Sequence, residues 1–402
     1  MTYLTESDVH NYVNGICFKT GPPGRVGIET EWLVTDQQRP HLPVPLPQLQ
    51  ALVEEAGPLP NGSAVTFEPG GQLELSSPPL RGPATTCSAL AADLAHIEKR
   101  LNEAGLHLEG NGLDPHRSPT RQLALPRYVA MERYFDGGGG PSGRAMMCST
   151  ASLQVCLDIG ADRADLERRW RLVHRLGPVL LAAFANSPRW RGRPTGWRST
   201  RWAIWAAIDS SRTRPAASDD PVSDWTGYAL AARTMAVPRA DGPWLVDPGI
   251  AFGAWVAGDR TPRPTSEDLE YHLSTLFPPV RPRGWLELRM VDALPEPWWP
   301  VPVAVAAALV DDPAAARVAS GATERLCGGS GPGRGVWLAA ARDALTDRGI
   351  AACARVCFAA ACEALAGMGA ASLVPVVEEY RERYVERGRC PADDQLATGG
   401  EL

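Results

Sequence analysis

Several glutamates occupy alternate positions in short segments that are otherwise apolar. Glu29 and Glu31 follow this pattern in one segment, Glu74 in a second and Glu287 in a third. Residues two apart in a β-strand share a face, so we expect each acid to lie opposite the apolar face of its strand. If the strands share one sheet, the acids gather and repel across roughly 5 Å. Mg2+ or Mn2+, which prefer oxygen ligands, relieve that repulsion. The pattern therefore favours a metal site over an ordinary solvated face.

Complementary groups are expected on and near the same face. Alternation in a fourth segment adds Gln154, and Arg289 lies on the polar side of the third. An arginine-rich stretch, residues 186–214, carries interleaved tryptophans, a mixture that also occurs in nucleic-acid binders. Trp202 and Trp205, however, are three apart in an expected helix and are predicted to pack in the core. Planar guanidinium groups suit phosphate and carboxylate recognition. Acids, metal and arginines together are typical of phosphoryl transfer from a nucleotide.

The elements that must position these side chains are strands separated by helices. We expect strands at residues 25–35, 63–67, 72–76, 106–110, 146–158 and 285–291. We expect helices at residues 85–104, 162–185 and 224–236, and then at 302–310, 313–325, 335–348, 350–366 and 374–387. The glycine-rich stretches 137–140 and 328–335 are expected to be surface loops. Because the strands do not alternate regularly with helices, an α+β fold with a mainly antiparallel sheet is favoured over a doubly wound one.

The length allows one large domain or two ordinary ones, and the composition indicates a globular chain. The chain has 402 residues, of which 44% are hydrophobic and 21% charged, a composition that supports a large core. We expect a catalytic domain at 1–390, with a sheet-containing core at 20–295 and a helical part at 296–390. Residues 391–402 are polar and are expected to form a flexible tail.

Charge and cysteine content narrow the class of protein further. A net charge of -6 disfavours a nucleic-acid partner. We expect no membrane span, since no apolar stretch of about 18 residues is evident. The nine cysteines form no CxxC motif, which is typical of reduced thiols in a cytoplasmic protein. The N-terminus lacks the apolar core of a signal peptide.

The segment TFEPGGQLELS at residues 66–76 closely resembles the EPGGQxELS motif of plant-type glutamate–cysteine ligases. Further matching segments follow in the same order as in that family. They are GIETE at 27–31, QVCLD at 154–158, ANSP at 185–188, STR at 199–201, DSSRT at 209–213, HLSTLFP at 272–278 and LELR at 286–289. The resemblance covers about residues 20–295. Among bacterial members the chain is most similar to the actinobacterial ligases that feed ergothioneine synthesis.

The resemblance implies a fold, a reaction and a set of site residues. The fold would be a cup-shaped, mainly antiparallel sheet with helices on its outer face, as in glutamine synthetase and guanidino kinases. The reaction would join glutamate and cysteine with ATP and several Mg2+ ions, through a γ-glutamyl phosphate intermediate. The implied metal ligands are Glu29, Glu31, Glu68, Glu74 and Glu287, and Glu29, Glu74, Glu287 and Arg289 are implied to be catalytic. Arg201, Gln154 and Tyr228 are implied to bind substrate, and Arg212, Arg281 and Gln154 to bind the phosphates of ATP.

Some positions depart from the family pattern and leave alternatives open. Ser149 and Cys156 stand where plant members have Arg and Asn, and residues 206–209 read AAID instead of TDTD. A ligase of the same family with another amine, a guanidino-type kinase, and an inactive binding protein are the alternatives. For the favoured ligase we expect small-molecule partners alone (glutamate, cysteine and ATP) and a monomer rather than a dimer.

Overall fold

The computed structural model describes residues 3–138, 140–216, 219–245, 249–328 and 331–398. At its centre is an open sheet in the order β2-β3-β1-β6-β10-β9, with β4 and β5 paired to other parts of β1, and every pairing is antiparallel. The strands are β1 (Arg25–Asp36), β2 (Ala64–Phe67), β3 (Leu73–Ser76), β4 (Leu80–Arg81), β5 (Leu106–Glu109), β6 (Ser152–Asp158), β9 (Val280–Pro282) and β10 (Trp285–Asp292). A separate hairpin joins β7 (Arg189–Trp190) and β8 (Arg193–Pro194). The predicted α+β class with an antiparallel sheet is confirmed.

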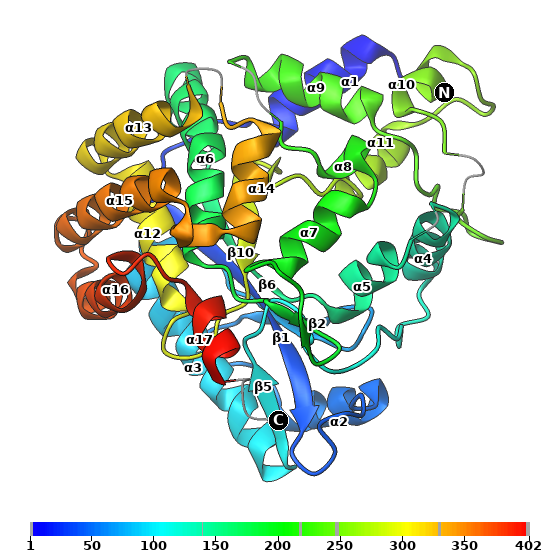
Figure 1. Ribbon diagram of the computed structural model, residues 1–402. Helices are drawn as coiled ribbons and strands as arrows, with labels where there is room; N and C mark the ends of the chain where they lie inside the picture. The colour runs from blue at the N-terminus through cyan, green and yellow to red at the C-terminus, as the bar shows by residue number, and fades with distance from the viewer. Residues whose placement is uncertain (1–2, 139, 217–218, 246–248, 329–330, 399–402) are drawn as a thin grey trace.

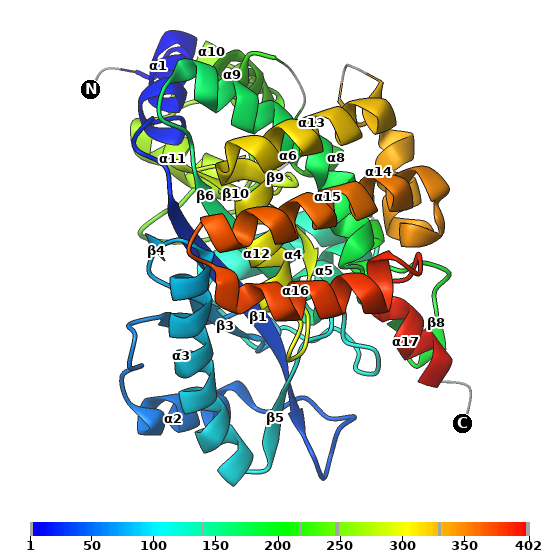
Figure 2. The same ribbon diagram turned by 90° about the vertical axis from the view of Figure 1, so that its left-hand side faces the viewer.

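Two layers of helices cover the apolar face of the sheet. The first layer contacts the strands directly and consists of α3 (Pro83–Glu103), α6 (Arg163–Ala183) and α12 (Pro300–Asp311). The second contains α13 (Pro313–Cys327), α15 (Arg348–Gly367) and α16 (Val374–Tyr380), to the left of the sheet in Figure 1 and in front of it in Figure 2. Ile28, Leu75, Val155 and Leu288, from four neighbouring strands, are at most 1% exposed in this core. The apolar residues that alternate along each strand therefore face these helices.

A different group of helices lies on the polar side of the sheet. It contains α4 (Pro126–Gly137), α5 (Ser142–Ser149), α7 (Thr200–Ala207) and α8 (Ser210–Thr213), on the right in Figure 1. Beyond them lie α1 (Glu6–Tyr12), α9 (Pro221–Ala231), α10 (Phe252–Ala257) and α11 (Ser266–Ser274). The remaining α-helices are α2 (Leu46–Ala56), α14 (Arg334–Arg342) and α17 (Pro391–Thr398). Because α4, α5 and α7 stand over the polar face, they can close a site against the sheet.

Several expected elements differ from the structure, among them one strand, one helix and the C-terminal tail. The strand expected from residue 146 begins only at Ser152, because residues 142–149 form α5. The helix expected to run to residue 236 ends at Ala231. Residues 391–398, expected to belong to a flexible tail, form α17, in which Asp393 accepts a hydrogen bond from Arg198 (2.7 Å) and Gln395 donates one to Asn186 (2.6 Å). The polar side chains of this segment form these hydrogen bonds.

By length and composition alone, α15 could cross a membrane, contrary to the expectation that no segment could. In the fold it packs against α6, α12, α13 and α16. Ala354, Cys357 and Phe358 on its inner side are fully buried. Its hydropathy is accounted for by this position inside the helical layers.

Candidate active site

The polar face of the sheet carries the predicted acids side by side. Glu31 on β1 lies opposite Glu74 on β3, and Glu29 lies opposite Gln154 on β6. Directly opposed residues of antiparallel strands project to the same side, and these four side chains line one cavity of about 350 Å3. Glu68, from the turn between β2 and β3, lines it as well. The structure thus brings together four of the five predicted metal ligands.

Three of these carboxylates converge. Glu31, Glu68 and Glu74 each offer an oxygen atom, and the three atoms lie within 4.8 Å of one another. Burial raises the pKa of Glu68 well above its usual range, and the charges of Glu31 and Glu74 raise it further. Burial likewise raises the pKa of Glu31 and of Glu74. Such a cluster of buried, mutually repelling acids suits a divalent cation with oxygen ligands.

Glu29 and Glu287 lie farther along the same face in contrasting surroundings. Burial, followed by the charges of Glu287 and Glu74, raises the pKa of Glu29 to about 7. Glu287 is fully buried, and burial alone would raise its pKa, but Arg281 and Arg289 outweigh that effect and lower it to about 2. Glu287 is therefore already neutralised by arginines, whereas the charge of Glu29 is left open to the cavity.

The opposite wall of the cavity is basic. Arg281 donates to Glu287 through Nε (3.1 Å) and Nη2 (2.8 Å), and Arg289 also bonds Glu287. Gln154 joins the two walls, since its Nε2 donates to Glu31 (3.3 Å) and its Oε1 accepts from Arg289. Fixed guanidinium groups facing acids provide places for both a phosphate and its cation.

Arg201 lies behind this wall. It is 3% exposed and donates through Nη2 to the main-chain oxygen of Arg289 (2.9 Å). Together with Arg289 and Trp205 it lines a separate cavity of about 20 Å3. Its partner Asp292 lies 3.7 Å away and is fully buried. Arg201 does not line the main cavity but contacts Arg289, which does. Its predicted substrate-binding role stays a prediction.

Two predicted site residues are placed elsewhere by the structure. Arg212 is fully buried, and all three of its guanidinium nitrogens donate to protein groups: Nε to Asp209 (3.0 Å), Nη1 to Thr275 (2.8 Å) and Nη2 to Tyr134 (3.2 Å). Each Nη also has a second acceptor. These five bonds use every N–H of the group, so Arg212 has no donor free for a phosphate in this structure, and its phosphate-binding role stays a prediction.

Tyr228 is likewise a core residue. It is 1% exposed, stacks on Trp225 with 5.0 Å between ring centroids, and donates to the main-chain oxygen of Arg214 (3.1 Å). It does not line the cavity, and its predicted contact with substrate stays a prediction. The burial of both residues is set by tertiary packing, which a resemblance in sequence does not show.

Sequence reasoning also missed part of the wall. Arg127 and Tyr128 enter the cavity from the start of α4, Met146 and Met147 from α5, and Trp205 from α7. Trp205 was expected in the core with Trp202, and only Trp202 fits that prediction, since it is 8% exposed and stacks on Trp337. The missed residues lie on helices that only the tertiary fold brings over the sheet.

An antiparallel sheet with acids opposite arginines on its polar face is a site suited to ATP-dependent ligases, which activate a carboxylate by phosphorylation. Comparison with known proteins narrows this class. Residues 25–402 match the model of glutamate-cysteine ligase family 2, and the chain belongs to that family.

Named relatives agree with this assignment. The chain is 41% identical to glutamate–cysteine ligase EgtA of Mycolicibacterium smegmatis, over 95% of this chain and 89% of the relative. It is 41% identical to EgtA of Mycobacterium tuberculosis H37Rv, over 97% of this chain and 90% of the relative. The chloroplastic ligase of Brassica juncea is 34% identical over 58% of this chain and 46% of its own length.

A solved structure supports the fold. The glutamate–cysteine ligase GshA of Francisella tularensis, crystallised with AMP, superposes with a TM-score of 0.53 at 10% identity. The match covers 94% of this chain and 85% of the other. At this level of identity the superposition supports the fold alone.

Proposed function

We propose that this chain is an ATP-dependent glutamate–cysteine ligase that forms γ-glutamylcysteine, as a step toward ergothioneine. The observation that carries the proposal is the acid-lined cavity facing Arg281 and Arg289, in a chain 41% identical to EgtA ligases over most of its length. The substrates are small molecules: glutamate, cysteine and ATP.

The acid cluster fits Mg2+. Glu31, Glu68 and Glu74 converge within 4.8 Å, and burial raises the pKa of each because no guanidinium fully compensates their charge. Glu29 is the fourth candidate ligand in the wall. When bound, Mg2+ would neutralise these acids and polarise the phosphate and carboxylate oxygens of the substrates.

The residues of the chain supply orientation and charge. Arg289, held by Glu287 and Gln154, and Arg281, held by Glu287, present guanidinium groups for the transferred phosphoryl group. The γ-carboxylate of glutamate attacks the γ-phosphorus of ATP, giving γ-glutamyl phosphate and ADP. The amine of cysteine then attacks the acyl carbon and phosphate leaves, so an amide and free phosphate are the products. Positioning rather than a protein nucleophile does this work.

An assay of ADP and phosphate release with ATP, glutamate and Mg2+ tests the proposal. We expect phosphate release to depend on cysteine and γ-glutamylcysteine to appear by mass spectrometry. Serine and glycine serve as control amines and should support much less turnover. Equal or faster turnover with another amine would assign the chain to a different ligation.

The guanidino-type kinase remains the second candidate on this kind of sheet. It predicts ADP without phosphate, together with a stable phosphorylated product. The cysteine-dependent release of phosphate separates the two activities in the same assay. The match to the glutamate-cysteine ligase family model across residues 25–402 favours the ligase.

A further inference from the structure

Glu68 differs from the other two converging acids in what holds it. Glu31 and Glu74 lie on paired strands, whereas Glu68 stands at the start of the turn between β2 and β3. Within the turn, the Gly71 N–H donates to the main-chain oxygen of Glu68 (2.8 Å), and the Glu68 N–H donates to the main-chain oxygen of Gln72 (2.9 Å). The place of the Glu68 carboxylate therefore depends on the groups that pack around this turn.

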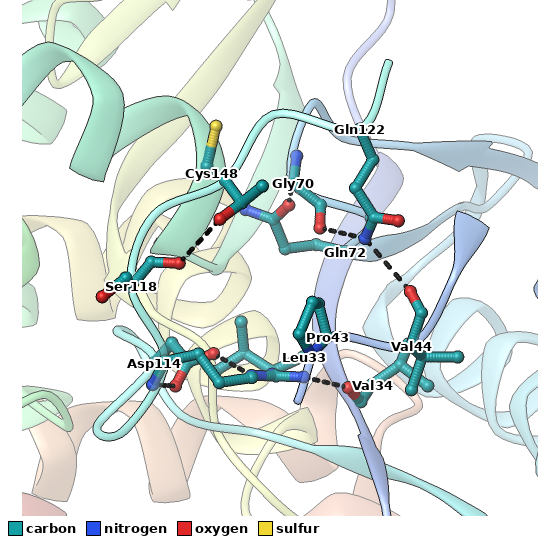
Figure 3. A pocket seen from close by; sticks show the side chains of 13 residues that line it. Leu33, Val34, Pro43, Val44, Gly70, Gln72, Asp114, Ser118, Gln122 and Cys148 are labelled. Carbon is teal, nitrogen blue, oxygen red and sulfur yellow. Dashed lines mark hydrogen bonds and ion pairs between the residues drawn. The ribbon is translucent and has the colours of Figure 1, made fainter. Parts of the chain in front are cut away.

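One side chain from a distant segment holds the turn from outside. The Gln122 Nε2 donates to the main-chain oxygens of Gly70 (2.9 Å) and Val44 (3.1 Å), and its Oε1 accepts from the N–H of Leu46 (2.9 Å). Its own N–H donates to the oxygen of Pro69 (2.7 Å). Figure 3 shows Gln122 between Gly70 and Val44. All three residues line a cavity of about 30 Å3. A single amide thus ties the turn to the start of α2.

The turn fits closely between Gln122 and α5. A Cβ on Gly71, whose φ is +92°, would lie 2.5 Å from the Gln122 Nε2. A Cβ on Gly70 would lie 2.2 Å from the main-chain oxygen of Cys148. On the inner side, the Gly70 N–H donates to the Gln72 Oε1 (3.0 Å). Contacts of this tightness leave the turn little freedom when Gln122 is in place.

We propose that Gln122 is a positioning residue that sets the Glu68 carboxylate within the metal site. Gln122 does not line the main cavity, and its side chain acts on the turn through the main-chain oxygen of Gly70, two residues after Glu68. Its segment then leads into α4, which carries Arg127 and Tyr128 into the cavity. The inference rests on the proposed function, because it takes Glu68 to be a ligand of Mg2+.

The test measures Mn2+ binding to the full-length protein without ATP, by electron paramagnetic resonance, together with kcat at saturating metal. Gln122→Met keeps the length of the side chain and removes the amide donor and acceptor. We expect the Kd for Mn2+ to rise at least five-fold, with a smaller change in kcat. The matched control Gln48→Met, at an exposed position on α2, should leave the Kd unchanged.

A double-mutant cycle separates positioning from general destabilisation. Glu68→Gln should itself weaken Mn2+ binding, and adding Gln122→Met to it should cause little further loss. If Gln122→Met lowers the melting temperature but leaves the Kd for Mn2+ unchanged, its role is structural and the inference is overturned. An unchanged Kd in Glu68→Gln overturns it too, although the ligase proposal survives if the wild type still makes γ-glutamylcysteine. Failure of the wild type to bind Mn2+ overturns both the inference and the assigned metal site.

Discussion

Glu74 and Glu287 lie on the same polar face of the sheet but have opposite electrostatic surroundings. Burial and then the neighbouring Glu31 raise the pKa of Glu74. Arg281 and Arg289 overcome burial and lower the pKa of Glu287 to about 2. Alternation in the sequence predicted the shared face correctly but carried no information on which acid is neutralised within the protein. The two residues should therefore respond differently to the same substitution.

Glu74→Gln should remove an acid that repels its neighbours. We expect activity to fall about 100-fold or more, because a candidate Mg2+ ligand is lost, in the range seen for groups that stabilise charge in the transition state. The melting temperature of the metal-free protein should stay the same or rise, since repulsion within the cluster decreases. Calorimetry with and without Mg2+ checks this, with the exposed Glu54→Gln on α2 as control. A large loss of metal-free stability would contradict this view of the cluster.

Glu287→Gln should instead leave the guanidinium groups of Arg281 and Arg289 without the buried anion that pairs with both. Removing one partner of a buried ion pair costs about 3–5 kcal/mol, so we expect a clear fall in melting temperature together with a large loss of kcat. Weaker Mn2+ binding at unchanged metal-free stability is the opposing result. It would show that Glu287 binds metal, as the family resemblance implies, rather than anchoring Arg281 and Arg289.

At the scale of elements, a β-bulge in β10 decides which residues reach the polar face. The register with β6 shifts between Leu288 and Val291. Strict alternation would place Asp292 with Leu288 on the apolar side, but after the bulge Asp292 lies opposite Ser152. The bulge thus turns Asp292 toward Arg201, and the sequence pattern gave no sign of it, since an extra residue in a strand inverts alternation locally.

Asp292 holds the segment that carries Arg201. Its carboxylate accepts from the Asn186 N–H (2.9 Å), the Ser187 Oγ (2.7 Å) and the Ser199 Oγ (2.9 Å), and Ser199 is the N-cap of α7. We predict that Asp292→Asn raises KM for glutamate about tenfold with a smaller change in kcat, because Arg201 loses its anionic partner. Steady-state kinetics with glutamate varied at saturating ATP and cysteine measure this. An increase in KM for ATP alone would argue against Arg201 as the glutamate-binding residue.

At the scale of the whole molecule, the sheet and its two faces were predictable, and the covering of the polar face was not. Alternation is a local property and identified β1, β3, β6 and β10 with their acids. The apolar run at residues 146–149 was compatible with either strand or helix, and the fold made it part of α5. Arg212 lies in a family motif, but it and Tyr228 are both buried by packing between distant helices. Those placements depend on tertiary contacts that no single segment encodes.

Two buried histidines make the stability of the whole fold depend on pH. His174 and His272 are 3% and 2% exposed, and burial lowers their pKa to about 4 and about 3. In the unfolded chain they titrate near a pKa of about 6.5, so between these values the unfolded state binds more protons than the folded state. The unfolding free energy therefore falls as pH drops below about 6.5, by up to about 1.4 kcal/mol per pH unit for each histidine.

His272→Gln tests this contribution, because the Gln side chain offers an N–H to replace the bond between His272 Nε2 and the Ala229 oxygen (2.9 Å) but does not titrate. We expect the unfolding free energy of the variant to fall less steeply than that of the wild type between pH 6.5 and pH 5. The slopes should differ by up to about 1.4 kcal/mol per pH unit, the contribution of one proton. Urea unfolding at several pH values gives that slope directly, and the exposed His10→Gln on α1 is the control. Parallel pH profiles for His272→Gln and the wild type would mean that His272 is not held neutral by burial.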